Sequence, residues 1–175
     1  FMKTNADALA WADVVALIVA LVALGSGLIV LGASASRKTC ARMMKLDGLP
    51  GPLEMLTFRL QGLVLVLAGL LMAAPVVPDF APVSPEALYV GVLVVFALQT
   101  VGNLFIWFKG DELIRRVVVE TGAASFWVLQ GGLFLYAAAE RLGLVETLTA
   151  WQATAVMMCV YVLTSVVVAV RRGLS

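Results

Sequence analysis

Five long apolar stretches, almost free of charged residues, decide what this chain can fold into. They run from Val14 to Ala33, from Leu60 to Val77, from Leu88 to Phe108, from Val117 to Ala139 and from Ala150 to Val170. A helix needs about 20 mostly apolar residues to cross a bilayer, and it satisfies its own backbone hydrogen bonds there. None of the stretches alternates apolar and polar residues as outer-membrane strands do. The pattern therefore predicts an all-α, polytopic membrane protein with five transmembrane helices.

The overall composition also indicates a membrane environment. Of the 175 residues, 62% are hydrophobic and 13% are charged, whereas a soluble domain averages about 45–50% apolar and about 25% charged residues. A water-soluble core of this size could not bury so much apolar surface. We therefore expect residues 1–175 to form a single transmembrane helical domain. The net charge of +1 creates no basic field that would attract nucleic acid, which is excluded as a partner.

The first stretch lies near the N-terminus, where a secretory signal peptide would also place an apolar segment. Acidic residues, Asp7 and Asp13, precede the stretch in place of the basic residues of a signal peptide. The stretch is also longer than the apolar region of most signal peptides. We therefore expect it to be retained as a transmembrane helix.

The basic residues predict the orientation of the chain. With five spans, ten of the twelve lysines and arginines lie on one side of the membrane: Arg37, Lys38, Arg42, Lys45, Arg59, Lys109, Arg115, Arg116, Arg171 and Arg172. The other side carries Lys3 and Arg141 with six acidic residues: Asp7, Asp13, Asp79, Glu86, Glu140 and Glu146. Loops rich in lysine and arginine stay in the cytoplasm. We therefore expect the N-terminus outside and the C-terminus in the cytoplasm.

Two connections between the stretches have distinctive sequences. The first contains the basic segment Arg37–Lys45, which forms either the cytoplasmic end of the first helix or a short interfacial helix suited to anionic lipid. Anchoring by the positive-inside rule alone explains the same residues. The second connection, Pro75–Pro85, contains four prolines and is expected to hold no helix. Ser84 and Pro85 are expected to cap and start the next helix.

A cluster of charged residues precedes the fourth stretch. Asp111 follows Gly110 and can cap a helix. Glu112, Arg116 and Glu120 succeed one another at intervals of four and can form ion pairs along one helix face. A helix start with surface ion pairs accounts for this pattern. The alternative is a carboxylate at the mouth of a proton path, or a cytoplasmic docking motif composed of Asp111, Glu112, Arg115, Arg116 and Glu120.

This motif and its surroundings resemble a group of small uncharacterised bacterial inner-membrane proteins. The resemblance rests on the pattern Asp-Glu-x-x-Arg-Arg at 111–116, on Glu120, on a short loop near Gly143 and on the final Arg171-Arg172. It covers residues 88–175. Members of the group carry the Asp-Glu-x-x-Arg motif on the cytoplasmic side, between two helix pairs. The resemblance implies this topology and a bacterial inner membrane, and it implies no activity.

A few polar side chains lie inside the apolar stretches. Gln99 and Asn103 are four residues apart and share a helix face in the third stretch, and Gln130 lies in the fourth. Amides are disfavoured in lipid, so each should face another helix or a cavity. Hydrogen bonding between helices is the plainer explanation, worth about 0.6 kcal/mol on average. The alternative is a polar intramembrane site between the third and fourth helices, lined by Gln99, Asn103 and Gln130.

Small residues recur in three of the stretches and allow close contact between helices. They are Gly25, Gly27, Gly32, Gly62, Gly69, Ala123, Ala124, Gly131 and Gly132. No Gly-x-x-x-Gly pattern occurs among them. The contacts can be made within the chain or with another subunit.

The residue types argue against an enzyme. The chain has no histidine and only two cysteines, Cys40 and Cys159, which excludes a disulfide framework and most zinc, haem and histidine-based sites. The adjacent Asp111 and Glu112 point in different directions on a helix. We therefore expect no catalytic, cofactor-binding or metal-binding residues, and no bound cofactor. A lipid or carotenoid in an apolar groove is left open.

Two functions fit these observations. The first is a non-enzymatic accessory or assembly subunit, packed laterally in a larger bacterial inner-membrane complex of the respiratory or photosynthetic type. Its partners would be membrane lipids and other integral membrane subunits. The alternative is a protomer of a small oligomeric channel or transporter, in which the polar site between the third and fourth helices lines the pathway. The absence of an ionisable residue near mid-membrane favours the first, because coupled transport normally needs one.

Overall fold

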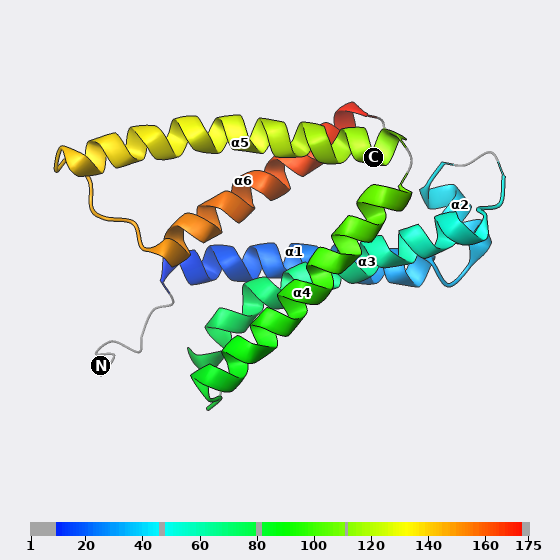
Figure 1. Ribbon diagram of the computed structural model, residues 1–175, viewed down its shortest axis with the longest axis horizontal. Helices are drawn as coiled ribbons and strands as arrows, with labels where there is room; N and C mark the ends of the chain where they lie inside the picture. Colours follow the sequence, from blue (N-terminus) through cyan, green and yellow to red (C-terminus); the bar gives the residue numbers. More distant parts are fainter. Residues whose placement is uncertain (1–9, 46–47, 80–81, 111, 173–175) are drawn as a thin grey trace. The chain divides into compact units, whose positions relative to one another are not determined.

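The structure is a computed structural model that describes residues 10–45, 48–79, 82–110 and 112–172 (Figure 1). Its elements are α1 (Trp11–Ala33), α2 (Arg37–Met43), α3 (Pro52–Ala73), the 3-10 helix η1 (Ala74–Asp79), α4 (Pro85–Lys109), α5 (Glu112–Arg141) and α6 (Ala150–Arg171). The described residues contain no strand. Five of the helical segments are long and apolar enough to span a membrane. The predicted all-α fold with five spanning helices is confirmed to this extent.

The helix α3 begins earlier than its apolar stretch indicated, at Pro52 rather than Leu60. The backbone N–H of Gly51 donates to Glu54 Oε2 at 2.7 Å, and Pro52 occupies the first helical position, where a missing N–H costs nothing. The polar residues Glu54, Thr57 and Arg59 fall in the first two turns. They interrupt the apolar run without interrupting the helix.

The basic segment after α1 forms the separate helix α2, which decides between the two structures predicted for it. Ser36 caps α2, because its side chain accepts a hydrogen bond from the backbone N–H of Thr39 at 3.5 Å. A turn at residues 34–36 separates α2 from α1. The segment is therefore a short helix of its own and does not extend α1.

The proline-rich connection is partly helical, so the expectation that it holds no helix was wrong. Pro75 has no N–H to donate and its ring clashes with the preceding turn, so the α-helix ends at Ala73. The chain continues as the 3-10 helix η1, a tighter form common at the ends of α-helices. The predicted start of α4 is confirmed, since the Ser84 side chain accepts from Ala87 N at 3.1 Å and Pro85 follows.

The chain divides into two compact units. The central unit comprises residues Leu17–Glu112, and the terminal unit comprises Phe1–Ala16 together with Leu113–Ser175. The central unit is held by close backbone contacts between α1 and α3. A Cβ atom placed on Gly27 would lie 2.7 Å from the carbonyl oxygen of Gly62, and one placed on Gly69 would lie 2.9 Å from that of Ala20. Glycine is therefore required where these helices meet. A Cβ atom placed on Gly102 of α4 would lie 2.7 Å from a side-chain methyl group of Val64 in α3.

In the terminal unit, residues 142–149 connect α5 to α6 (Figure 1). Gly143 ends α5 in the left-handed conformation, with a φ of 72°. The N–H of Gly143 donates to Glu140 O at 3.0 Å and that of Leu144 to Ala139 O at 2.9 Å, which forms a Schellman motif. Thr149 then caps α6.

Candidate functional site

The terminal unit contains a cavity of ≈ 480 Å³ between α5, α6 and the connection that joins them. Its lining residues are Trp11, Val128, Leu129, Gly132, Leu133, Tyr136, Glu146, Thr147, Leu148, Gln152, Val156 and Val160. Figure 1 shows α5 and α6 close together near the end of α6 and apart toward residues 142–149. The cavity occupies the wider part, which makes it the main candidate site of this unit.

The cavity changes character along its length. Its deep end is formed by Val128 of α5 and Val160 of α6, and its other end by Tyr136 and Gln152. Eight residues separate the two ends on each helix, which corresponds to about 12 Å at 1.5 Å per residue. The apolar part is therefore deep in the span, and the polar part lies where the helices leave it.

Hydrogen bonds hold the polar end in place. The hydroxyl of Tyr136 donates to the carbonyl oxygen of Glu146 at 2.7 Å, which fixes the connection against α5. The backbone N–H of Gln152 donates to Thr149 Oγ1 at 3.2 Å, and the N–H of Thr149 donates to Gln152 Oε1 at 2.9 Å. This reciprocal capping box fixes the side chain of Gln152 at the cavity. A ligand would thus meet a largely formed polar rim.

Two buried hydroxyl groups lie on the α5 face that lines the cavity. Thr121 and Ser125 are buried, and neither Thr121 Oγ1 nor Ser125 Oγ has a hydrogen-bond partner among the described residues. Their spacing of four places them on one face, which also contains Gly132 and Tyr136. Such hydroxyls in a helix commonly bond to the carbonyl four residues earlier. Without that bond, each carries a desolvation cost. Neither residue was predictable from the sequence, because a single hydroxyl inside an apolar stretch does not reveal its partners.

An ion pair joins the opposite ends of α5 and α6. The guanidinium of Arg172 donates from Nε to Glu120 Oε2 at 3.0 Å and from its terminal nitrogen to the other carboxylate oxygen. A second hollow of ≈ 570 Å³ lies beside this pair and is lined by Glu120, Ala123, Ala124, Trp127, Val168, Arg171 and Arg172. The pair is partly exposed, so it sets where the helices meet more than it stabilises the fold.

The predicted docking motif is only partly described. Asp111 lies outside the described residues, so its role as a helix cap stays a prediction. The helix does continue from Glu112 to Arg141, and Arg115, Arg116 and Glu120 lie in its first turns. Glu120 forms its ion pair with Arg172 of α6. The predicted pairing of Glu112, Arg116 and Glu120 along α5 stays a prediction.

The predicted polar site between the third and fourth spanning helices is divided between the two units. Gln99 and Asn103 belong to α4 in the central unit, and Gln130 belongs to α5 in the terminal unit. Gln99 is half-buried, whereas Asn103 and Gln130 are exposed. None of the three lines either of the two cavities described above. A shared site stays a prediction.

The central unit ends in a small apolar cluster beside the basic helix α2. Cys40 is fully buried with Ala33, Met55 and Phe58, and its thiol lies 3.6 Å from the sulfur of Met44. Burial raises the pKa of the Cys40 thiol, and the negative charge of Glu54 adds to this. Arg59 donates to the carbonyl oxygen of Ser34 at 3.3 Å, which closes the end of α1 against α3.

The described residues contain no group of three histidine, cysteine or acidic side chains that could hold a metal ion. Comparisons of the chain with protein-family models, curated proteins and solved structures find no match. The candidate site is therefore the cavity of the terminal unit, characterised by its own geometry.

Proposed function

We propose that this chain is a non-enzymatic accessory or assembly subunit that packs laterally in a larger bacterial inner-membrane complex of the respiratory or photosynthetic type. A largely exposed face of α5 carries the proposal, and its Ala124 and Trp127 also line the hollow beside the Glu120–Arg172 pair. Ala124, Gly131 and Ala138 recur on this face every seven residues, over which an α-helix drifts by only about 20°. Ala124 and Gly131 are exposed, and no atom lies within 4 Å of a Cβ placed on Gly131.

The α1–α3 contact illustrates what this spacing achieves inside the chain. There Ala20 and Gly27 of α1 are seven residues apart, as are Gly62 and Gly69 of α3, and the backbones approach closely at these positions. Small side chains do not improve the contact of a helix with lipid, whereas they let a neighbouring helix approach closely and gain dispersion energy. A transmembrane helix of another membrane protein is therefore the occupant that suits the α5 face.

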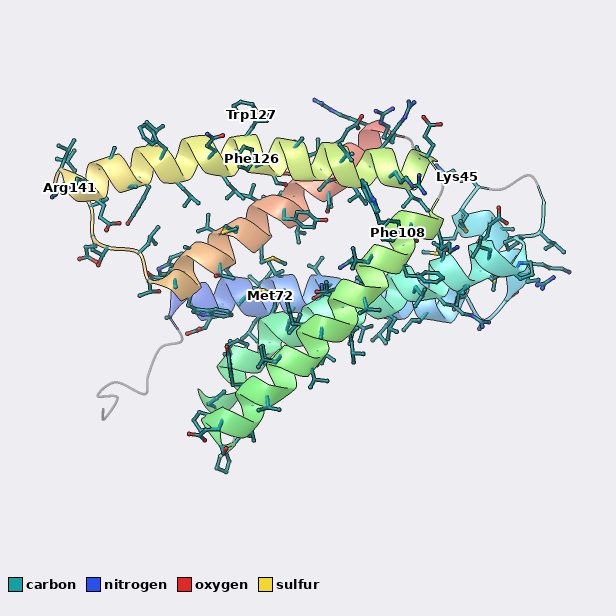
Figure 2. All side chains as sticks on the ribbon, viewed as in Figure 1. Lys45, Met72, Phe108, Phe126, Trp127 and Arg141 are labelled. Carbon is teal, nitrogen blue, oxygen red and sulfur yellow. The ribbon has the colours of Figure 1, made fainter. Side chains whose placement is uncertain are left out.

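An exposed aromatic residue lies on the same face. Trp127 is 71% exposed and contacts Phe126 edge to face, with ring centroids 6.2 Å apart. The two rings project from the middle of α5 (Figure 2). Tryptophan is enriched among the residues that dominate binding energy at protein interfaces. Trp127 beside Ala124 and Gly131 would give a partner helix both a large anchor and a place for close approach.

The proposal includes the orientation with the N-terminus outside and the C-terminus in the cytoplasm. Successive spans must alternate in direction. The C-terminal ends of α1, α4 and α6 and the N-terminal ends of α3 and α5 therefore share one side of the membrane, together with the basic residues next to them. The positive-inside rule assigns that side to the cytoplasm. The channel or transporter alternative has no comparable support, because Gln99, Asn103 and Gln130 line neither described cavity.

Co-purification from native membranes in mild detergent tests the proposed function. We expect an integral membrane partner in stoichiometric amount with the wild type and its loss with Gly131→Leu. The matched control is Gly132→Leu, which adds the same side chain one residue further on, on the cavity face, and should retain the partner. A pure homo-oligomer, or equal recovery with both variants, would refute the subunit proposal.

Cysteine accessibility tests the orientation. Cys40 is buried and a poor probe, so Thr39→Cys in a Cys40→Ser background is preferable, with Ser84→Cys for the other side. Thr39 and Ser84 are both exposed. We expect an impermeant maleimide to label Ser84→Cys from outside and Thr39→Cys only after the membrane is opened. Labelling of both from the same side would contradict five spans.

A further inference from the structure

The cavity of the terminal unit has the dimensions and polarity of a site for one lipid chain. Its volume of ≈ 480 Å³ lies within the range of about 300–1,000 Å³ that is typical of small-molecule sites. Its length of about 12 Å along the helices is close to half of the roughly 30 Å of hydrocarbon in a bilayer. The cavity therefore extends through one leaflet, the one on the side of residues 142–149.

The lining separates an apolar tail region from a polar head region. Val128, Leu129, Leu133, Val156 and Val160 surround the inner part of the cavity. Gly132 provides room there, since no atom lies within 4 Å of a Cβ placed on it. The rim is formed by Tyr136, Glu146, Thr147, Gln152 and the ring of Trp11. This is the arrangement that an amphiphile with one chain in the cavity requires.

The charge at the rim distinguishes between head groups. Glu146 is a lining residue of the rim, Asp13 is held nearby by Trp151, and Glu140 lies one turn beyond Tyr136 on α5. Arg141 is the only basic side chain described at this end of the unit, and it lies at the end of α5 (Figure 2). It follows Tyr136 by five residues, which is about 140° around the helix. The rim is thus acidic and favours a cationic group on the ligand.

We propose that the cavity binds one phospholipid with a primary ammonium head group, a phosphatidylethanolamine, from the leaflet on the side of residues 142–149. One acyl chain lies between α5 and α6, and the ammonium lies against the Glu146 carboxylate. The hydroxyl of Thr147 and the amide N–H₂ of Gln152 are the donors available to the phosphate. In the proposed orientation this is the outer leaflet.

Native mass spectrometry of the purified full chain in mild detergent tests this site. Dioleoyl phosphatidylethanolamine and dioleoyl phosphatidylglycerol are titrated separately. The wild type is expected to bind one ethanolamine lipid saturably. Gly132→Leu fills the cavity and should weaken lipid binding at least about tenfold, because the acyl chain of the lipid loses its apolar enclosure. Gly131→Leu, the matched control outside the cavity, should bind as the wild type does.

A second variant and a head-group variant complete the test. Val156→Phe fills the cavity from α6 and should reproduce the loss, which guards against misfolding of Gly132→Leu. The preference for ethanolamine over glycerol should be about threefold, because an exposed ion pair contributes little, and Glu146→Gln should abolish it. Unchanged binding in both cavity-filling variants would identify ordinary annular lipid and overturn the site. Equal binding of both lipids by the wild type would overturn the head-group assignment.

The lipid site and the proposed subunit function can fail separately. Gly131 and Gly132 are adjacent, yet only Gly132 lines the cavity. Gly131→Leu should lose the partner and still bind lipid. Gly132→Leu should lose the lipid and still bind the partner. Each result would support both proposals.

Discussion

The indole nitrogen of Trp151 donates a hydrogen bond of 2.8 Å to a carboxylate oxygen of Asp13 and ties the first turn of α6 to the first turn of α1. The two residues are 138 positions apart in the sequence, and both belong to the terminal unit. The bond is a polar link between the start of α1 and the α5–α6 pair. It lies beside the rim of the candidate lipid cavity, which includes Trp11 and Gln152.

Replacing Trp151 by Phe should lower the stability of the protein, because an aromatic ring is retained while the donor to Asp13 is lost. A hydrogen bond to a charged group contributes about 1.5–3 kcal/mol, and this one is only partly buried, so we expect about 1.5 kcal/mol. Thermal unfolding in detergent measures the change. Trp127→Phe, at a highly exposed position, is the matched control and should unfold as the wild type does. An equal effect of both substitutions would show that the Asp13 bond contributes nothing specific.

The close contact of α1 with α3 predicts that two glycines of α1 differ sharply in tolerance. A Cβ on Gly27 would lie 2.7 Å from the Gly62 carbonyl oxygen and 2.8 Å from the Val66 backbone nitrogen, whereas one on Gly25 meets no atom within 4 Å. Gly27→Ala should therefore destabilise the protein by about 1–3 kcal/mol, the usual cost of overpacking. Gly25→Ala should be neutral or slightly stabilising, because alanine favours helix. Denaturation in detergent measures both, and a tolerant Gly27→Ala would contradict the contact.

The buried hydroxyl of Thr121 predicts that valine is tolerated better than alanine at this position. Valine keeps the shape of the side chain and removes a polar group that has no partner among the described residues. Thr121→Val should therefore leave stability unchanged or raise it by about 1 kcal/mol. Thr121→Ala leaves a small void and should lower it by about 1 kcal/mol. A clear loss of stability in Thr121→Val would show instead that the hydroxyl is hydrogen-bonded in the membrane.

The thiol of Cys40 should react slowly and with a marked dependence on pH. Burial, and next the charge of Glu54, raise the pKa of the thiol, so less thiolate is present at neutral pH than at an exposed cysteine. Maleimide labelling of the folded protein should be slow at pH 7 and accelerate above pH 9. Thr39→Cys, on the exposed side of α2, is the reference, and comparable labelling rates at pH 7 would contradict the burial of Cys40.

The same raised pKa has a consequence for stability. In the unfolded chain the thiol ionises at its ordinary pKa, whereas in the folded chain it stays protonated to higher pH. Between these two values the unfolded state binds fewer protons, so the free energy of unfolding falls as pH rises. Cys40→Ser removes this titration. The free energy of unfolding of the wild type should therefore fall relative to that of the variant as pH rises above 9, which unfolding curves at alkaline pH measure.

The elements that follow from local sequence were predictable. The five spanning helices follow from continuous apolar runs, and the start of α4 follows from Ser84 and Pro85, which act within one turn. The early start of α3 was missed because Glu54, Thr57 and Arg59 lower the hydropathy of its first turns without weakening the helix. The 3-10 helix η1 was missed because prolines end an α-helix and yet permit this tighter form.

The candidate site was not predictable in the same way. Tyr136, Glu146 and Gln152 carry no motif, and they form a rim only because the connection 142–149 folds back and Thr149 caps α6. The amides Gln99, Asn103 and Gln130 were more conspicuous in the sequence, yet they line neither described cavity. A polar residue that stands out in the sequence need not lie near other polar residues in the fold. A site requires side chains that come together in space.

The sequence by itself determined that this chain is helical and suited to a membrane, because apolar runs of spanning length leave the backbone no other way to satisfy its hydrogen bonds in lipid. It did not determine which faces of those helices are filled. The tertiary structure decided that neighbouring backbone fills the space beside Gly27, Gly62 and Gly69, and that Gly132 lines a cavity. In lipid, apolar side chains gain little from burial, so contacts depend on shape and on a few hydrogen bonds between distant residues, such as that from Trp151 to Asp13.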